Sequence, residues 1–259
     1  MKKVFAIAAM AAMLIACGEP EENKPNGGEN NGGNTEQPGG GETPEFVPAI
    51  TLDGNFADWA EAEGVAVLTL NEGETYAYPA LKKVQLCSDE LYIYIYAEYD
   101  PAQVMNLCTY LDIDADETTG RCTPCQGIEL YMEGSVAEWT ADEAGNPTTP
   151  KVADVAYDAG GYKFTGEDGT DGWAWEGILE AGIGFVSSCV PAAVGENVAV
   201  EVSLLKALCP LPLGNEVGIC MSVSSYGWAE IGTLPQYSDE EKAADETLTG
   251  RAACYVLAL

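Results

Sequence analysis

Four acidic residues lie close together near the middle of the chain and could bind a metal ion. Asp112, Asp114 and Asp116 alternate with other residues, and Glu117 follows directly. In an extended chain this spacing places the three aspartates on one side. Carboxylates brought together repel one another unless a cation or surrounding donors offset the repulsion. Calcium takes about six to eight oxygen ligands in irregular geometry, so we expect a structural calcium ion at these four residues.

The same stretch has a second interpretation, in which the aspartates only form a turn. It departs from an EF-hand loop, because Glu117 stands where that loop needs glycine and Thr123 stands where it needs a bidentate glutamate. Aspartate is a common turn residue, so a solvated hairpin turn would also produce the pattern. In both interpretations a strand runs out to Ile113, the turn ends at Gly120, and a return strand covers residues 128–132.

Aromatic residues form a second group that could bind a ligand. Residues 91–99 alternate strictly, which predicts a strand with a row of tyrosines, Tyr94 among them, on one face. Sugar rings stack on aromatic rings, so this row is a candidate sugar platform. Trp173 and Trp175 follow a Gly-rich acidic turn and are further candidates. The alternative is burial, with the tyrosines in a packed layer beneath loops and the tryptophans in the core.

The composition excludes several classes of function. The chain has 11 basic and 42 acidic residues and a formal net charge of −31, so it repels nucleic acid and anionic lipid headgroups. It would attract cations. There is no histidine, which removes Ser-His-Asp and Cys-His mechanisms and histidine-ligated zinc. Catalysis would have to rest on carboxylates, lysine or tyrosine.

The beginning of the chain predicts export and lipid anchoring. A basic start and a short apolar run lead to Leu14-Ile-Ala-Cys17, which resembles the lipobox of bacterial lipoproteins. This implies a signal peptide at residues 1–16 and acylation of Cys17, with an ordinary secretory signal as the alternative. Residues 17–48 form an expected disordered tether rich in Gly, Asn, Glu and Pro. No other segment is long and apolar enough to cross a membrane, so only the acyl chains would contact it.

Acidic residues directly after Cys17 bear on the location of the protein. Glu19, Glu21 and Glu22 resemble the signal that sends some lipoproteins of Gram-negative bacteria to the cell surface. We therefore expect a lipid-anchored outer-membrane protein displayed at the surface, with a periplasmic position as the alternative.

Eight cysteines remain beyond Cys17, and an even number in an exported chain favours disulfides. Their pairing is open, because eight cysteines allow 105 combinations. Cys122 and Cys125 have the spacing of a redox motif, but no βαβ pattern surrounds them, so a structural loop is favoured. Buried free thiols are the alternative.

The remaining chain, residues 49–259, predicts a single all-β domain. Many short strands separated by Gly, Pro and Asp turns favour an antiparallel β-sandwich. Val155–Tyr157 and Tyr162–Phe164 flank Gly160-Gly161 and predict a hairpin, while residues 139–154 read as a loop. Trp59 is expected in the core, and Glu201 lies on a strand. Ser238 opens a capping box, which predicts a short helix from Asp239 to about Glu246.

These segments together resemble the family 9 carbohydrate-binding modules and their DOMON-like relatives. The matching stretches span almost the whole domain: Leu52–Trp59, Asp89–Ile93, Leu111–Asp114 running to Gly120, Gly127–Leu130, Val198–Glu201 and Gly227–Trp228. The resemblance implies a jelly-roll-like β-sandwich that binds a sugar and often holds structural calcium in acidic loops. It implies a pair of tryptophans that sandwich the sugar, for which Trp173, Trp175 and Trp228 are candidates. Haem-binding relatives use an axial histidine that this chain lacks, so no haem is expected.

The sequence thus predicts a non-catalytic, glycan-binding surface lipoprotein. The alternative is an envelope or adhesion scaffold, in which a calcium-stabilised sandwich binds a protein partner. A glycosidase ranks last, because no motif singles out a pair of carboxylates for acid and base roles.

Overall fold

The computed structural model describes residues 46–70, 79–157, 159–178 and 182–259. The predictions for the signal peptide, for acylation of Cys17 and for the tether up to residue 45 lie outside the described residues. None of the helices in the described part of the chain has the length and hydropathy of a membrane span.

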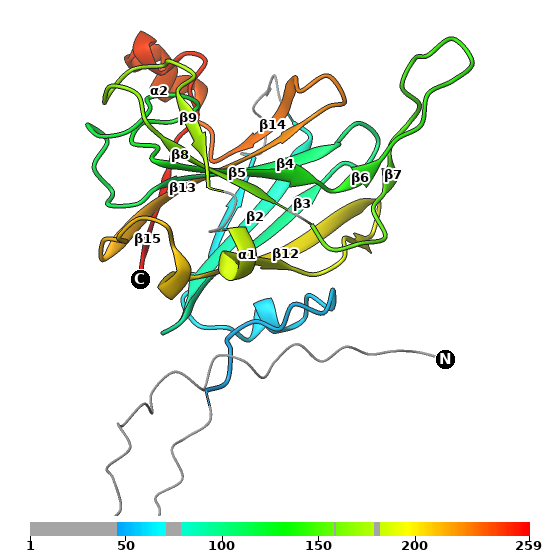
Figure 1. The fold of residues 1–259 in the computed structure, drawn as a ribbon, viewed down its shortest axis with the longest axis horizontal. Coiled ribbons are helices and arrows are strands. Elements are labelled where there is room, and N and C mark those ends of the chain that lie inside the picture. Colours follow the sequence, from blue (N-terminus) through cyan, green and yellow to red (C-terminus); the bar gives the residue numbers. More distant parts are fainter. Residues whose placement is uncertain (1–45, 71–78, 158, 179–181) are drawn as a thin grey trace, which may run out of the picture. The chain divides into compact units, whose positions relative to one another are not determined.

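Two antiparallel sheets pack face to face, as Figure 1 shows. In sheet A the order is β1 (Ala66–Thr69), β2 (Leu81–Ser88), β3 (Tyr92–Tyr99), β12 (Asn197–Leu205) and β10 (Val186–Ser188), with β11 (Ala192–Val194) also on β12. In sheet B the order is β14 (Glu230–Leu234), β13 (Glu216–Ser224), β4 (Asn106–Asp112), β5 (Leu130–Ser135), β8 (Gly160–Phe164) and β9 (Trp175–Gly177), with β15 (Tyr255–Ala258) on β13. The predicted all-β antiparallel sandwich is confirmed.

Smaller elements complete the described fold. A two-stranded ribbon joins β6 (Ala137–Glu138) to β7 (Lys151–Val152), and the helices are α1 (Gly182–Phe185) and α2 (Asp239–Ala244). Three 3-10 turns are η1 (Asp58–Ala60), η2 (Lys206–Leu208) and η3 (Glu246–Leu248).

The core between the sheets follows the alternation of the strands. Ile93 and Ile95 of β3 face Leu107 and Leu111 of β4, and all four are at most 1% exposed. Burying each such side chain stabilises the fold by about 1.5–3 kcal/mol. Because this face of each central strand is used for the core, the opposite face of each sheet must be covered by other segments or exposed to solvent.

The outer face of sheet A is covered by residues 46–65, here called the first described segment. Ile50 and Trp59 pack on Tyr94 and Tyr96, and all four side chains are buried. The carboxylate of Glu201 accepts hydrogen bonds from Nε1 of Trp59 at 3.0 Å and from the backbone of Gly54 at 3.2 Å. The tyrosine row predicted for residues 91–99 is therefore a packed layer beneath this segment.

Two local predictions are wrong. Gly160 and Gly161 lie inside β8 instead of forming a hairpin turn, because Gly161 pairs with Met132 of β5. Residues 155–157 form no strand, and Tyr157 is buried and donates a hydrogen bond to the carbonyl of Leu107 at 3.1 Å. In addition, the expected loop at residues 139–154 contains β7 of the ribbon.

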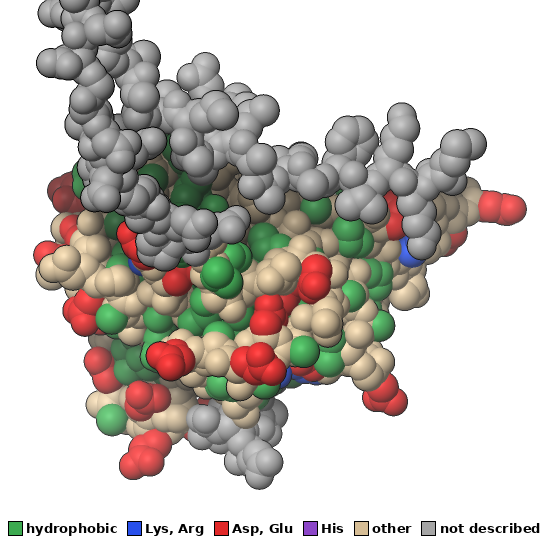
Figure 2. Space-filling view, turned by 90° about the horizontal axis from the view of Figure 1, so that it is seen from below, with side chains coloured by type: hydrophobic (Ala, Val, Ile, Leu, Met, Phe, Trp, Pro, Cys, Tyr) green, Lys and Arg blue, Asp and Glu red, His purple; other side chains and the backbone are tan. Residues whose placement is uncertain are grey.

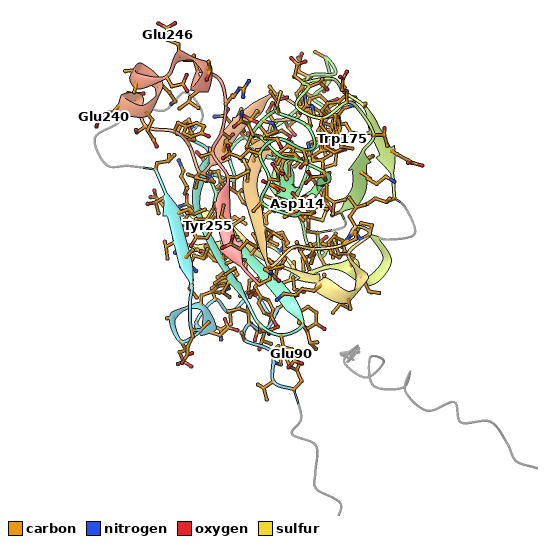
Figure 3. All side chains as sticks on the ribbon, turned by 90° about the vertical axis from the view of Figure 1, so that its left-hand side faces the viewer. Glu90, Asp114, Trp175, Glu240, Glu246 and Tyr255 are labelled. Atoms are coloured by element: carbon orange, nitrogen blue, oxygen red, sulfur yellow. The ribbon has the colours of Figure 1, made fainter. Side chains whose placement is uncertain are left out.

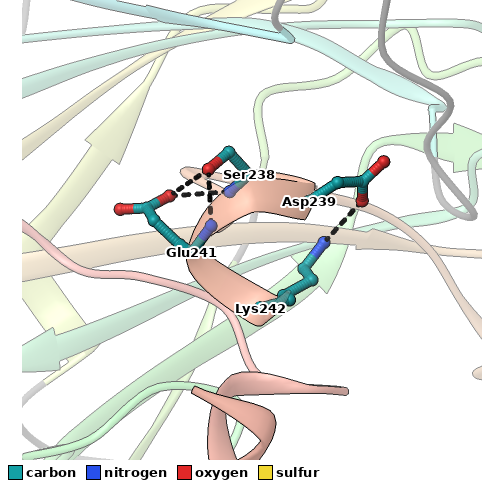
Figure 4. Close-up of polar contacts among 4 residues, drawn as sticks. All are labelled: Ser238, Asp239, Glu241 and Lys242. Atoms are coloured by element: carbon teal, nitrogen blue, oxygen red, sulfur yellow. Dashed lines mark hydrogen bonds and ion pairs between the residues drawn. The ribbon is translucent and has the colours of Figure 1, made fainter. Parts of the chain in front are cut away.

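The predicted C-terminal helix is confirmed as α2. Figure 4 shows its capping box, in which the hydroxyl of Ser238 accepts from the backbone of Glu241 and the Glu241 carboxylate accepts from the backbone of Ser238. These bonds satisfy two donors that the first turn of a helix would leave unpaired. On the face displayed in Figure 2, red acidic side chains are scattered among hydrophobic and other side chains, and few side chains are blue.

Candidate functional site

Three tyrosines form a row across the outer face of sheet B. Tyr110 of β4 pairs in register with Tyr131 of β5, which pairs with Tyr162 of β8. The centroids of the Tyr110 and Tyr131 rings lie 5.0 Å apart with an interplanar angle of 15°, and those of Tyr131 and Tyr162 lie 5.5 Å apart at 26°. Side chains at directly paired positions share one face of a sheet, which explains why these rings stack.

Two tryptophans extend this row. The Trp175 ring lies 5.5 Å from the ring of Tyr131, and the Trp173 ring lies 6.2 Å from both Tyr131 and Trp175. Trp173 is 71% exposed. Nε1 of Trp175 is buried and has no hydrogen-bond acceptor among the described residues. We call Tyr110, Tyr131, Tyr162, Trp173 and Trp175 the aromatic face.

Polar groups line the edge of the aromatic face. A second row lies two residues along the strands from the tyrosine row. It is formed by paired residues of four adjacent strands: Thr233 of β14, Ser222 of β13, Cys108 of β4 and Glu133 of β5. The Glu133 carboxylate accepts a hydrogen bond from the hydroxyl of Tyr131, and burial raises the pKa of Glu133. The aromatic face thus presents the exposed ring of Trp173 and parts of Tyr162 and Trp175, above the buried rings of Tyr110 and Tyr131 and beside a partly desolvated carboxylate.

The loop that carries Trp173, residues 165–174, is held by Arg121. The Nε atom of Arg121 donates to the carbonyl of Gly172 at 3.2 Å, and a second guanidinium nitrogen donates to the carbonyl of Asp171 at 3.0 Å. The guanidinium also donates to the carbonyl of Thr123. Desolvation lowers the pKa of Arg121, but a guanidinium stays charged at neutral pH. We call residues 165–174 the tryptophan loop.

A group of three carboxylates lies at the end of β4. Oxygen atoms of Asp112, Asp114 and Glu129 all lie within 4.8 Å of one another. In the view of Figure 3, Asp114 is labelled between Trp175 above it and Glu90 below it. The site joins two strands, because Leu111 pairs with Leu130 and so brings Glu129 beside Asp112.

The surroundings of this carboxylate group are unfavourable for three negative charges. Asp112 is 2% exposed, and desolvation together with Glu129 and Asp114 raises its pKa to about 7. Burial also raises the pKa of Glu129. Within the described ranges no lysine or arginine forms an ion pair with any of the three. Backbone donors offset part of the repulsion, since the amide of Asp116 lies 3.2 Å from oxygens of both aspartates.

Glycine is required beside Asp112. Gly127 has a φ of +82°, and a Cβ there would lie 2.5 Å from Oδ2 of Asp112. A Cβ at Gly218 would lie 2.9 Å from the Cβ of Asp112. The chain therefore leaves space around this carboxylate on two sides.

The structure gathers some of the predicted site residues and separates others. Trp173 and Trp175 lie together, whereas Trp228 is 59% exposed in the turn between β13 and β14. Tyr94 is 1% exposed under the first described segment, so its ring is not open to a ligand. Asp112 and Asp114 lie together with Glu129. Asp116 and Glu117 are outside that group.

Sequence reasoning missed Glu129 and the tyrosine row of sheet B. Each of Tyr110, Tyr131 and Tyr162 is a single tyrosine in its own strand, so no local pattern marks them. Glu129 could have been found from the predicted hairpin. When Leu111 of β4 pairs with Leu130 of β5, Glu129 lies opposite Asp112.

Comparison with known proteins gives limited information. No protein-family model matches the sequence, and no curated protein matches it. Among solved structures, the chain resembles a family 9 carbohydrate-binding module from Caldicellulosiruptor kristjanssonii in complex with cellotriose, with 13% identity and a TM-score of 0.40. The match covers 81% of this chain and 89% of that one. A likeness this distant leaves the function to be argued from the residues of this chain.

Proposed function

We propose that this protein binds a glycan, without catalysis, on the aromatic face of sheet B. The observation that carries the proposal is the exposed Trp173 ring next to Trp175 and Tyr131. Trp173 is exposed, whereas Tyr131 and Tyr110 are buried and Tyr162 and Trp175 are half-buried. A large ring left exposed on top of a packed aromatic cluster favours a binding surface, because folding alone would bury it. Sugar rings present an apolar face that packs on such rings, and aromatic contacts contribute beyond the buried area.

Polar groups of the same face supply hydrogen bonds for sugar hydroxyls. Nε1 of Trp175 has no acceptor among the described residues but is covered by protein atoms, so the polar group open to a ligand is the carboxylate of Glu133. Glu133 would accept from a hydroxyl, and a hydrogen bond to a charged acceptor is worth roughly 1.5–3 kcal/mol. Rings for stacking and polar atoms for orientation are the two components of a small-ligand site.

Calcium at Asp112, Asp114 and Glu129 is part of the proposal. Three carboxylates within 4.8 Å, one of them buried and none in an ion pair within the described residues, are stabilised by a bound cation. Oxygen ligands alone suit calcium. The ion would fix the turn after β4 and the strand β5 that bears Tyr131, so its role is structural.

The location completes the proposal and rests on sequence. Acylation at Cys17 would anchor the protein in the outer membrane, and the acidic residues that follow favour display on the cell surface. A surface position would let the aromatic face capture oligosaccharides or polysaccharides for neighbouring proteins.

The proposal is tested by binding of the purified full chain, kept in detergent, to an array of glycans with calcium and again with a chelator. We expect binding that falls at least tenfold in Trp173→Ala and in Trp175→Ala. Trp228→Ala is the matched control, because it removes an equally large exposed ring outside the aromatic face. Loss of binding only in the control would move the site to the β13–β14 turn.

Absence of binding to every glycan would favour the alternative function, a scaffold that uses its acidic surface to hold a protein partner. Loss of binding on chelation, with thermal stability lowered in parallel, would agree with a structural calcium ion. Unchanged binding and stability on chelation would contradict it.

A further inference from the structure

Three cysteines distant in sequence gather above the outer face of sheet B. Cys125 lies in the loop between β4 and β5, Cys220 is in the middle of β13, and Cys254 directly precedes β15. The sulfur atoms of Cys125 and Cys254 lie 2.8 Å apart. Unbonded heavy atoms settle at about 3.5–4.0 Å, while bonded sulfurs lie at about 2.05 Å. These two sulfurs are therefore closer than an unbonded contact favours.

The backbone also holds the two segments together. The amide of Ala252 donates to the carbonyl of Pro124 at 2.8 Å, so the residue before Cys125 already pairs with the residue two positions before Cys254. The Cys254 sulfur lies 3.8 Å from the carbonyl of Gln126. A crosslink here would need the sulfurs to approach from 2.8 Å to about 2.05 Å, with the two segments already joined by a backbone hydrogen bond.

We infer that Cys125 and Cys254 form a disulfide that fastens residues 121–128, here called the cysteine loop, to the start of β15. The bond would fix the segment that supports Trp173, because Arg121 belongs to the cysteine loop and binds the tryptophan loop. A further bond joins the two loops, because the amide of Cys122 donates to the carbonyl of Thr170 at 2.9 Å. The amide of Gly169 also donates to the carbonyl of Gly120, the residue before the cysteine loop, at 2.8 Å.

The bond forms by thiol–disulfide exchange with a disulfide of an oxidoreductase or of glutathione. The Cys254 thiolate attacks that disulfide, forms a mixed disulfide and releases one thiol; the Cys125 thiolate then attacks the Cys254 sulfur and releases the second. Two protein thiols are oxidised and one external disulfide is reduced to two thiols. Cys254 is the more accessible of the pair, whereas Cys125 is 1% exposed. Burial also raises the pKa of Cys125, so Cys254 reacts first.

Cys220 is the competing partner for Cys125. It is fully buried in β13; the neighbouring Cys125 sulfur acts to lower the pKa of Cys220, but burial outweighs this and leaves the pKa raised. The 2.8 Å distance between the sulfurs of Cys125 and Cys254 favours Cys254 as the partner, so Cys220 would remain a free thiol beside the disulfide. All eight described cysteines are unbonded in the structure. Cys122 also belongs to the cysteine loop, and Cys108 lies in the same buried cluster as Cys125 and Cys220. Cys87 is buried under the cover of sheet A, and Cys189 lies in the core between the sheets.

The test uses the full chain exported by a host with an oxidising envelope. Thiols are blocked with N-ethylmaleimide before lysis, and the protein is digested without reductant for mass spectrometry. We expect one crosslinked pair of peptides that contains Cys125 and Cys254 and disappears after reduction. In Cys254→Ser we expect Cys125 to be alkylated on denaturation, and in the control Cys87→Ser we expect the crosslink to persist.

A Cys125–Cys220 link, or eight alkylated cysteines in both exported protein and protein incubated with oxidised glutathione, would overturn the inference. Hydrogen exchange gives a second readout. Reduction should speed exchange of the amides of residues 121–128 in the wild type by at least tenfold and leave Cys254→Ser unchanged. Equal rates before and after reduction of a linked wild type would overturn the supporting role.

The effect on ligand rests on the proposed function. If the aromatic face binds a glycan, reduction should weaken binding several-fold in the wild type and not in Cys254→Ser. The crosslink and the exchange rates are measured without glycan, so failure of glycan binding leaves the inference standing, and failure of the crosslink leaves glycan binding standing.

Discussion

The guanidinium carbon of Arg121 lies 5.3 Å from the centroid of the Trp173 ring. Arg121 thus contacts the exposed ring itself and also binds the carbonyls of Asp171 and Gly172 just before it. A loop that ends in a large exposed ring has little packing to fix it. In this protein a single cation supplies both a cation–π contact and backbone hydrogen bonds.

Replacing Arg121 should therefore weaken glycan binding without removing any sugar contact. Loss of a cation–π contact and of hydrogen bonds to the loop would cost about 1–2 kcal/mol, or roughly 5- to 30-fold in affinity. Arg121→Lys should recover little, because an ammonium lacks the planar fork that reaches two carbonyls. Titration calorimetry with the best glycan measures the effect. Lys151→Ala removes an exposed cation elsewhere and serves as the control; an equal loss there would indicate a general charge effect.

The raised pKa of Asp112 predicts an unusual pH dependence in calcium-free protein. Folding raises this pKa from 3.8 to about 7, so between these pH values the folded state holds a proton that the unfolded chain has lost. The free energy of unfolding should then fall as the pH rises from about 4 to 7, by up to about 1.4 kcal/mol per unit. Urea titrations in chelator measure it.

Asp112→Asn is the matched variant for this pH dependence. It should remove the contribution of this carboxyl and flatten the profile relative to the wild type. Saturating calcium should reverse the sign, because a bound cation favours the ionised carboxylates. A wild-type profile that coincides with that of Asp112→Asn in chelator would contradict the prediction.

Tyr94 should matter for stability and not for ligand binding. Its hydroxyl donates to Oδ2 of Asp89 at 2.6 Å, and that carboxylate also accepts from three backbone amides. Tyr94→Phe should cost about 1.5 kcal/mol, at the low end for a bond to a charged group, because the other donors remain. Chemical denaturation measures the loss, and Tyr226→Phe, at an exposed ring, should cost nothing. Weaker glycan binding in Tyr94→Phe would place the site on sheet A instead.

Glu201 should be essential for the first described segment. It is fully buried and joins β12 to Trp59 and Gly54. Glu201→Ala removes both acceptors and leaves a cavity, so we expect a loss of about 2–4 kcal/mol. Glu201→Gln keeps one acceptor oxygen and should lose less. Limited proteolysis provides the second measurement, with faster cleavage within residues 46–65 in the alanine variant. Equal cleavage of the wild type and the alanine variant would contradict this role.

Local patterns were sufficient to predict much of the fold. The alternation of residues 91–99 predicts β3, and the spacing of Ser238 and Glu241 predicts α2. Periodicity assigns residues to two sides of a strand, but it does not say which side is open. Both sides of β3 are buried, one by the core and one by the first described segment. Periodicity therefore left two interpretations of Tyr94 open, a sugar platform and a ring in a buried layer, and the structure shows the buried layer.

The candidate site depends on pairing between strands, which no local pattern reveals. Glu129 joins Asp112 through the register of β4 and β5, and the tyrosine row needs the register of three strands. The pair Gly160-Gly161 is typical of a turn, yet both glycines belong to β8, because this strand continues its pairing with β5 past Tyr162. Trp173 and Trp175 were found because one short segment contains both.

The segment that covers sheet A gives the sandwich a mechanical asymmetry. A pulling force applied at Phe46 would first load the bond from Ala49 to Asp89 and then the bonds that join Thr51 to Asp58 and Trp59 to Glu201. All of these bonds lie on the side of sheet A, whereas Trp173 and its neighbours lie across the core on sheet B. Tension on the start of the domain would detach the first described segment from sheet A, while the aromatic face on sheet B keeps its geometry.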